Sequence, residues 1–163
     1  MYDYAYAYRM ERRNPNYLSF TSDCANYASQ ALRKAGARAD NNHSIYIDGK
    51  NRTWSLTPDS WHINPTYGDA WAQAHYLRAF LVRNENGYRG PGGHAITYGS
   101  QLQLGDITFT HNGSTWFHTY IVVDPGPNFK IASHTGNRWM VNINTAAHEA
   151  QYPRSYVHIT TLN

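Results

Sequence analysis

The chain has 163 residues and a formal net charge of +3. This length is that of one ordinary domain, which buries enough surface to need neither disulfides nor a structural metal, and a single cysteine excludes an internal disulfide. The small charge, with no run of five Lys or Arg, argues against a nucleic-acid partner. The chain has no stretch of about 18 consecutive apolar residues, so the sequence predicts no membrane-spanning helix.

The composition is poor in charge and rich in tyrosine. Charged residues make up 15% of the chain, against about 25% in typical domains, and 14 residues are Tyr. This balance resembles that of exported bacterial domains. The first residues lack the basic and apolar regions of a signal peptide. We therefore expect residues 1–163 to be a single domain, excised from a longer protein that is secreted or delivered to the cell envelope.

Two helices are expected in the first 36 residues. Residues 4–13 are rich in helix formers and precede a Pro, so they predict a short helix followed by a loop. A second helix begins at Cys24, with Ser22 or Asp23 as its N-cap, and ends at Gly36. Its apolar positions repeat every 3.6 residues: Cys24, Tyr27, Ala28, Ala31, Leu32 and Ala35. Because this stripe is mostly Ala, we expect another element to pack closely against it.

The middle of the chain predicts less regular structure. Residues 37–66 are rich in Asn, Asp, Ser, Gly and Pro and are expected to be irregular. Residues 68–87 predict one amphipathic helix, and residues 87–105 a Gly-rich loop with one short strand.

The remainder of the chain predicts β-structure. Strands are expected within five segments rich in β-branched and aromatic residues: 105–111, 115–124, 128–135, 139–144 and 155–162. Helices followed by an antiparallel meander are typical of an α+β fold.

Cys24 is the first candidate for chemistry. The first turn of a helix has unpaired backbone N–H groups and the positive end of the helix dipole, which favour a thiolate. The same groups can bind an oxyanion. A hairpin centred on Gly126 would pair residue 121 with residue 131 and set His118 opposite His134, unless the register slips. Such a pair supplies a base and a residue that orients it.

These residues carry a resemblance to a known family. The segment "SDCANYASQALRKAG" resembles the cysteine motif of a family of bacterial amidase domains related to the NlpC/P60 cysteine peptidases. The matching positions are Asp23, Cys24, Asn26, Ser29, Gln30, Leu32 and Gly36. The segments "LGDITFTHNGSTWFHTYIVV" and "KIASHTGNR" are also similar to the family, whereas residues 37–60 follow no known pattern.

The resemblance implies a papain-like α+β fold, in which a Cys-bearing helix packs on an antiparallel sheet. It implies Cys24 as the nucleophile and His118 as the base. The third member of the triad is His134 by this resemblance, with Asn137 as the alternative. Asp23, Trp116 and Asn137 are the candidates for substrate binding, although Asp23 can equally cap the helix and Trp116 can simply pack.

The expected reaction is cleavage of an amide bond through a thioester on Cys24. Peptidoglycan stem peptides are the first expected substrate. The domain is also interpreted as the toxic part of a secreted antibacterial protein, which an immunity protein would neutralise, or as a toxin that cleaves or deamidates a cytosolic protein. A non-enzymatic module that binds the cell wall through aromatic side chains is a further alternative. No cofactor is expected.

A zinc enzyme is the remaining alternative, because the chain has nine histidines. His94, His111 and His118 are conceivable ligands. Their spacing matches no zinc motif, and the chain has neither His-Glu-x-x-His nor paired cysteines. The sequence therefore favours a metal-independent cysteine enzyme.

Overall fold

The computed structural model describes residues 1–163 except 11, 41, 58–65, 87–88 and 146–148. The helices are α1 (Tyr2–Ala7), α2 (Cys24–Lys34), α3 (Asp69–Ala72) and α4 (Ala74–Arg83), with 3₁₀ turns η1 (Gly99–Gln101) and η2 (Glu149–Gln151). The strands are β1 (Ser44–Ile47), β2 (Lys50–Thr53), β3 (Leu56–Thr57), β4 (Thr66–Tyr67), β5 (Gly92–Ile96), β6 (Ile107–His111), β7 (Trp116–Asp124), β8 (Lys130–Ser133), β9 (Arg138–Asn142) and β10 (Arg154–Thr161).

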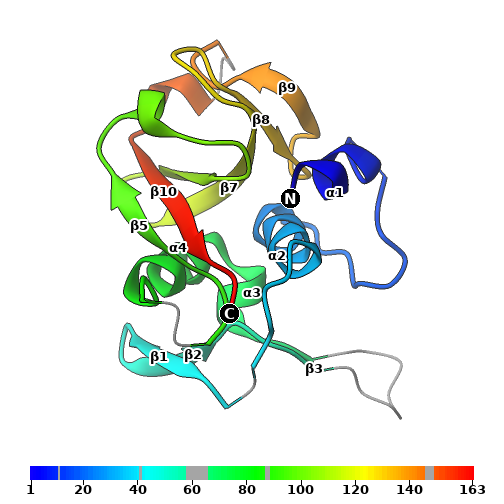
Figure 1. Ribbon diagram of the computed structural model, residues 1–163, viewed down its shortest axis with the longest axis vertical. Helices are drawn as coiled ribbons and strands as arrows, with labels where there is room; N and C mark the ends of the chain where they lie inside the picture. The colour runs from blue at the N-terminus through cyan, green and yellow to red at the C-terminus, as the bar shows by residue number, and fades with distance from the viewer. Residues whose placement is uncertain (11, 41, 58–65, 87–88, 146–148) are drawn as a thin grey trace.

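A six-stranded antiparallel sheet is the centre of the fold. Its order is β5-β10-β6-β7-β8-β9, and α2 and α4 both contact β7. Figure 1 shows the helices beside the sheet. The expected α+β class is confirmed, with the Cys-bearing helix packed against an antiparallel sheet. The first residues of β7, Trp116 and Phe117, lie near Cys24 at the start of α2.

The two faces of β7 belong to two different cores. Ile121 and Val123 point to the side of the helices, where they join a cluster that includes Trp54 and Trp71. Tyr120 belongs to a second cluster on the opposite face of the sheet. Side chains of a strand alternate between faces, so the parity of a residue in β7 decides which core it joins.

The helix predicted at Cys24 is confirmed, and its end is explained by Gly36. Gly36 has a φ of 117°, a conformation that only glycine adopts readily. Its N–H donates to Arg33 and that of Ala37 donates to Leu32, which closes the helix with a Schellman motif. The helix predicted at residues 4–13 is shorter than expected. It ends at Ala7, and Met10 has a φ of 60°, which no α-helix accommodates.

Two expectations for the middle of the chain are wrong. The segment 37–66 contains a β-hairpin with a two-residue turn. Asp48 and Gly49 form the turn, both with positive φ, and join β1 to β2. Residues 58–65 of that segment lie outside the described residues. The single helix predicted at 68–87 is two helices, because Gln73 is extended (φ −122°, ψ 127°) and separates α3 from α4.

All five predicted C-terminal strands are confirmed, but the meander is only partly so. Strands β6 to β9 follow one another in the sheet, whereas β10 crosses back and lies between β5 and β6. The expected register of the β7–β8 hairpin is wrong by one residue. Asp124 pairs with Lys130, so the turn is centred on Pro127 and not on Gly126. A bulge between Val122 and Asp124 removes one residue of this shift, and Ile121 then pairs with Ala132 and Val122 with Ile131.

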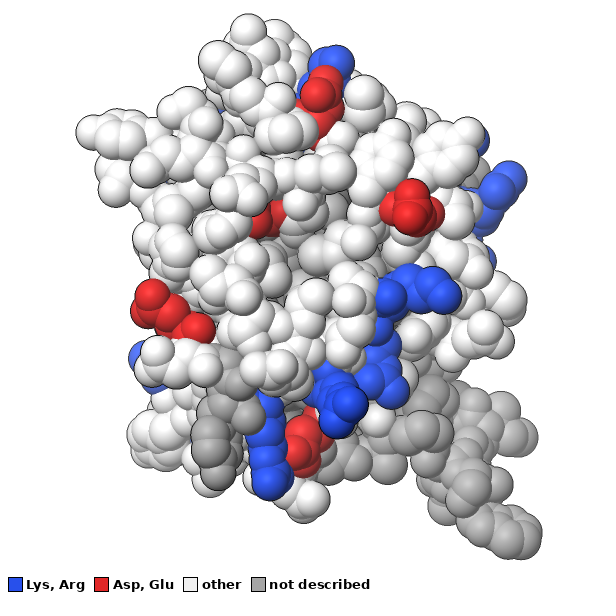
Figure 2. Space-filling model, viewed as in Figure 1, with Lys and Arg blue, Asp and Glu red and all other residues white. Residues whose placement is uncertain are grey.

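The low charge of the sequence is visible at the surface. Figure 2 shows one face that is mostly uncharged, with the basic side chains gathered in its lower half around an acidic one. Among the described residues, no helix has the length and apolar character that crossing a bilayer requires.

Gly92 marks a close approach of the sheet to α4. A Cβ at this position would overlap the carbonyl of Asn84, which follows α4 directly. We expect Gly92→Ala to lower the free energy of unfolding by about 1 to 3 kcal/mol, because backbone must move to admit the methyl group. Urea unfolding checks this, with Ala95→Ser as the control at an exposed position of the same strand. Equal stability of the two variants would contradict the tight packing.

Candidate active site

Cys24 lies at the first residue of α2, where the helix meets a surface cleft. The thiol is buried, with 2% of the residue exposed, and the cleft has a volume of about 470 Å³. Ser22 and Phe20 precede the thiol on one side of the cleft, and Trp116 of β7 and His75 of α4 also line it. The cleft therefore joins the N-terminal ends of two helices to one end of a central strand.

The environment of Cys24 keeps its sulfur protonated. Burial raises the pKa of the thiol, and hydrogen bonding from the backbones of Thr119 and Ala25 and the side chain of Thr135 offsets this only in part. The expectation that the helix start favours the thiolate is therefore wrong for this state, because desolvation outweighs the local N–H groups. The thiol needs a proton acceptor before it can attack a carbonyl.

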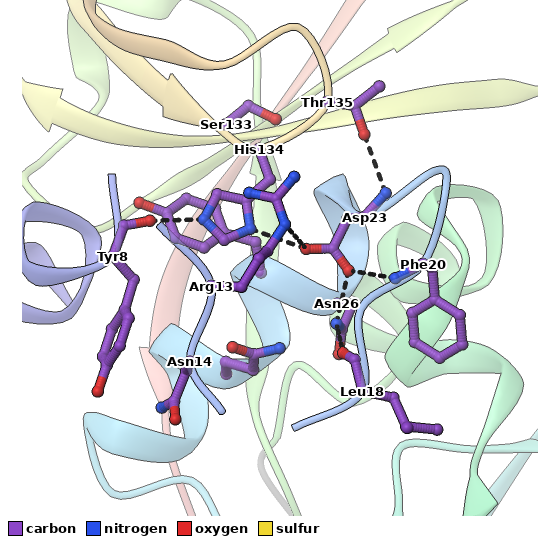
Figure 3. Close-up of polar contacts among 12 residues, drawn as sticks. Tyr8, Arg13, Asn14, Leu18, Phe20, Asp23, Asn26, Ser133, His134 and Thr135 are labelled. Carbon is purple, nitrogen blue, oxygen red and sulfur yellow. Dashed lines mark hydrogen bonds and ion pairs between the residues drawn. The ribbon is translucent and has the colours of Figure 1, made fainter. Parts of the chain in front are cut away.

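The Asp23 carboxylate connects the residues around Cys24 (Figure 3). One oxygen accepts hydrogen bonds from the Phe20 N–H (3.0 Å) and the Asn26 amide (2.7 Å). The other lies 2.8 Å from His134 Nδ1 and 3.5 Å from Arg13 Nε. The carboxylate makes no capping hydrogen bond to α2, and only 1% of it is exposed. Asp23 thus faces the protein interior and not the cleft.

Contacts with these donors change the pKa of Asp23. Burial raises it, but the hydrogen bonds from His134, Asn26 and the Phe20 backbone, together with the charge on His134, outweigh burial and lower the pKa. The Asp23 N–H also donates to the Thr135 hydroxyl at 2.9 Å. The acid and its own backbone therefore tie α2 to the turn that follows β8.

His134 is held from both sides of its ring. Nδ1 lies 2.8 Å from Asp23 and Nε2 lies 2.5 Å from the Tyr8 carbonyl, and the ring stacks on Tyr27 with centroids 3.7 Å apart. A carboxylate and a carbonyl only accept hydrogen bonds, so the ring lies between two acceptors that fix its orientation. His134 follows the end of β8 and does not lie opposite His118.

The structure does not bring His118 to Cys24. A bulge at Phe117 separates the pair His111–Trp116 from the pair Thr110–His118. Beyond it, His118 points to the same face as Tyr120, and their rings lie 4.3 Å apart. This is the face opposite α2. The bulge decides to which face of the sheet each side chain of β7 points. This could not be predicted, because nothing in the sequence shows where the bulge lies.

The remaining predicted residues lie in two places. Trp116 lines the cleft and also packs against the core beside α2. The Arg78 guanidinium lies over the Trp116 ring, 4.4 Å from its centroid. Asn137 has a φ of 48° and closes the turn after β8, where its N–H donates to the His134 carbonyl at 2.7 Å. Asn137 is therefore a residue of the turn that holds His134.

The conceivable zinc ligands lie on separate strands. His94 is in β5, His111 ends β6 and His118 is in β7. Within the part of the chain that the structure describes, no three His, Cys, Asp or Glu side chains form a group that could hold a metal ion.

His75, which lines the cleft, and Asp48, which contacts it, were not predicted as site residues. His75 falls within the helix predicted at residues 68–87, and no motif around it marks it out. Asp48 is in a segment that was predicted to be irregular. The dipeptide Asp48-Gly49 between alternating residues is a recognised hairpin signal, which would have placed the β1–β2 turn.

Comparison with known proteins gives one family. The family model described as "Putative amidase domain" matches residues 1–158. The chain is 27% identical over 143 residues to "Uncharacterized protein YhbB" of Bacillus subtilis (strain 168), which covers 86% of the chain and 39% of the relative. The chain thus spans about two fifths of that relative. No solved structure matches the chain.

The Asp23 contacts predict a pH-dependent contribution to stability. We expect Asp23→Asn to lower the free energy of unfolding at pH 7 by about 3 to 5 kcal/mol, because His134 loses its buried partner. The folded pKa of Asp23 lies below its unfolded value of about 3.9. Its stabilisation is therefore complete above that value and is lost as the pH falls through the folded pKa. Urea unfolding between pH 7 and pH 3 should show the two proteins converging in acid, and a constant difference would contradict this account.

The raised pKa of Cys24 predicts slow alkylation of the folded protein. Only the thiolate reacts with iodoacetamide, so the folded chain should be modified more slowly at pH 7 than the same chain in urea. Its rate should continue to rise above pH 8.5, where an ordinary thiol is half ionised. Intact-mass spectrometry follows the modification. Faster alkylation of the folded chain at pH 7 would show that the thiolate is favoured after all.

Proposed function

The chain belongs to this family of amidase domains, and from that premise we propose that it is a cysteine hydrolase of amide bonds with Cys24 as its nucleophile. One observation carries the assignment. The single sulfur of the chain lies at the first turn of α2 and lines a cleft large enough for a peptide segment. The first turn of a helix, with its backbone N–H groups, and an open cleft beside it suit acyl transfer to a thiol.

The proposed reaction has two steps. The Cys24 sulfur loses its proton and attacks the amide carbonyl, and the C–N bond breaks as the leaving amine takes up a proton. Water then attacks the thioester, which releases the carboxylic acid and restores the thiol. Hydrogen bonding from the Thr119 and Ala25 backbones lowers the pKa of the thiol and would stabilise negative charge on the sulfur as it loses its proton.

The family resemblance also implies a catalytic triad of Cys24, His118 and His134. His118 reaches the face of Cys24 only if the bulge moves by one residue, so that His118 and Phe117 exchange sides of β7. His134 supports the site in a different way from the one expected. It holds Asp23, and Asp23 holds the start of α2.

We place peptidoglycan stem peptides first among substrates. The support is chemical: the protein has a small positive charge, the cell wall is anionic, and the cleft offers the aromatic surfaces of Trp116 and Phe20 beside the thiol. Action on this polymer requires the protein to reach the cell envelope. Release into a competing cell, with an immunity protein that blocks the cleft, is compatible with the same chemistry.

Digestion of purified sacculi tests the proposal. We expect the protein to release peptide fragments, and Cys24→Ala to reduce the rate by about 10⁴-fold or more, because the nucleophile is lost. Cys24→Ser is the matched control, since it keeps the size of the side chain and replaces only the sulfur. Mass spectrometry of the fragments identifies the bond that is cut.

Two results would count against the proposal. Release of the same fragments by Cys24→Ala would remove the cysteine mechanism. No new fragments from the unmodified protein would remove peptidoglycan as the substrate.

A further inference from the structure

The wall of the cleft formed by α4 carries an imidazole that the proposed mechanism has not used. His75 is the second residue of α4, and 32% of its side chain is exposed. It lines the same cleft as Cys24, and so does Thr115, which precedes β7. A substrate seated over the thiol would therefore be within reach of this ring.

The Asp48 carboxylate orients the His75 ring. Asp48 Oδ2 lies 2.8 Å from His75 Nε2. The carboxylate is delivered by the tight turn between β1 and β2, in which Asp48 has a φ of 49° and Gly49 one of 77°. A carboxylate accepts a hydrogen bond, so Nε2 carries the hydrogen in the neutral ring and Nδ1 is the basic nitrogen.

The basic nitrogen of His75 is turned toward Thr115. Nδ1 lies 3.1 Å from the Thr115 hydroxyl, which donates a hydrogen bond to it when the ring is neutral. Rotation of this hydroxyl frees Nδ1 without moving the backbone. The charged groups around the ring are Asp48 and, beyond the adjacent Tyr76 ring, the ion pair of Arg52 with Asp69.

Two other histidines near the start of α2 are not available in the same way. Both nitrogens of His134 are bound, one to Asp23 and one to the Tyr8 carbonyl, and the ring is almost fully buried. The His118 ring lies with Tyr120 on the face of the sheet opposite α2. Among the described residues that line the cleft, His75 alone is a histidine.

We propose that His75, oriented by Asp48, is the residue that exchanges protons with Cys24 and the substrate in the cleft. This inference rests on the proposed function, because it assigns the proton transfers of that same reaction. It gives His75 the role that the resemblance gives to His118. A nucleophile, an imidazole and a carboxylate in one cleft are the elements of the catalytic triad, here with Nε2 on the carboxylate and Nδ1 as the base.

The protons balance in each step. His75 Nδ1 accepts the proton of the Cys24 thiol as the sulfur attacks the carbonyl carbon, and gives that proton to the leaving nitrogen as the C–N bond breaks. In the second step Nδ1 accepts a proton from water, whose oxygen attacks the thioester. The sulfur leaves and takes the proton back, so the thiol and the neutral imidazole are restored.

Rates of fragment release from sacculi test the assignment. We expect His75→Asn to reduce the rate by about 10² to 10⁴-fold, the range for loss of a general base, and Asp48→Asn to reduce it by less. His94→Asn, on β5 and away from the cleft, is the matched control and should keep the rate of the unmodified protein. Urea unfolding of each variant shows whether the fold is intact.

Two further measurements distinguish a role of His75 in proton transfer from a purely structural role. The pH profile of the unmodified protein should have an acid limb that comes from its general base, and His75→Asn should lose that limb. Free imidazole should restore part of the rate to His75→Ala, since it can occupy the vacated space. His75→Gln replaces His75→Asn if the latter does not fold.

The outcomes distinguish the inference from the proposed function. If Cys24→Ala is inactive while His75→Asn and Asp48→Asn keep the full rate, the nucleophile stands and the assignment of His75 fails. A complete loss in His118→Ala, with His75→Asn unaffected, would return the role of base to His118. If Cys24→Ala keeps its activity, the proposed function itself fails.

Discussion

The structure around Cys24 depends on one buried carboxylate. Asp23 accepts hydrogen bonds from the loop before α2 and from within α2, through Phe20 and Asn26, and it pairs with His134 beyond β8. His134 in turn reaches the backbone after α1, at Tyr8. Segments more than 100 residues apart are thereby fixed to the residue that precedes the thiol. These contacts fix the start of α2, and with it the Cys24 sulfur, because Asp23 directly precedes Cys24.

A thiol fixed in this way is protected but not activated. Burial raises the pKa of Cys24 more than the neighbouring hydrogen-bond donors lower it. The protein therefore stores the sulfur as an unreactive thiol and requires a proton acceptor at the cleft. The start of α4 supplies a histidine there, and the β1–β2 turn supplies the carboxylate that orients it. In the proposed mechanism the site has two parts: a buried interior that positions the nucleophile, and a more exposed wall that exchanges protons.

Sequence patterns predicted the elements better than their mutual placement. The apolar stripe after Cys24 and the β-branched C-terminal segments predicted α2 and the strands, because both signals are local and periodic. The family match agrees with the amidase resemblance. The faces of His118 and His134 could not be predicted, since one bulge reverses the parity of a strand and one residue of register changes every partner. The Asp48-Gly49 hairpin was within reach of sequence reasoning and was overlooked amid polar residues.

Trapping the acyl-enzyme tests the central claim most directly. The protein is mixed with a stem peptide prepared from sacculi, quenched in acid within the first turnover, digested and mapped by mass spectrometry. The account predicts an adduct of the acyl portion on the peptide that contains Cys24, and its removal by hydroxylamine, which cleaves thioesters. Steady release of products with no adduct on Cys24 at any quench time, together with turnover by Cys24→Ala, would contradict it.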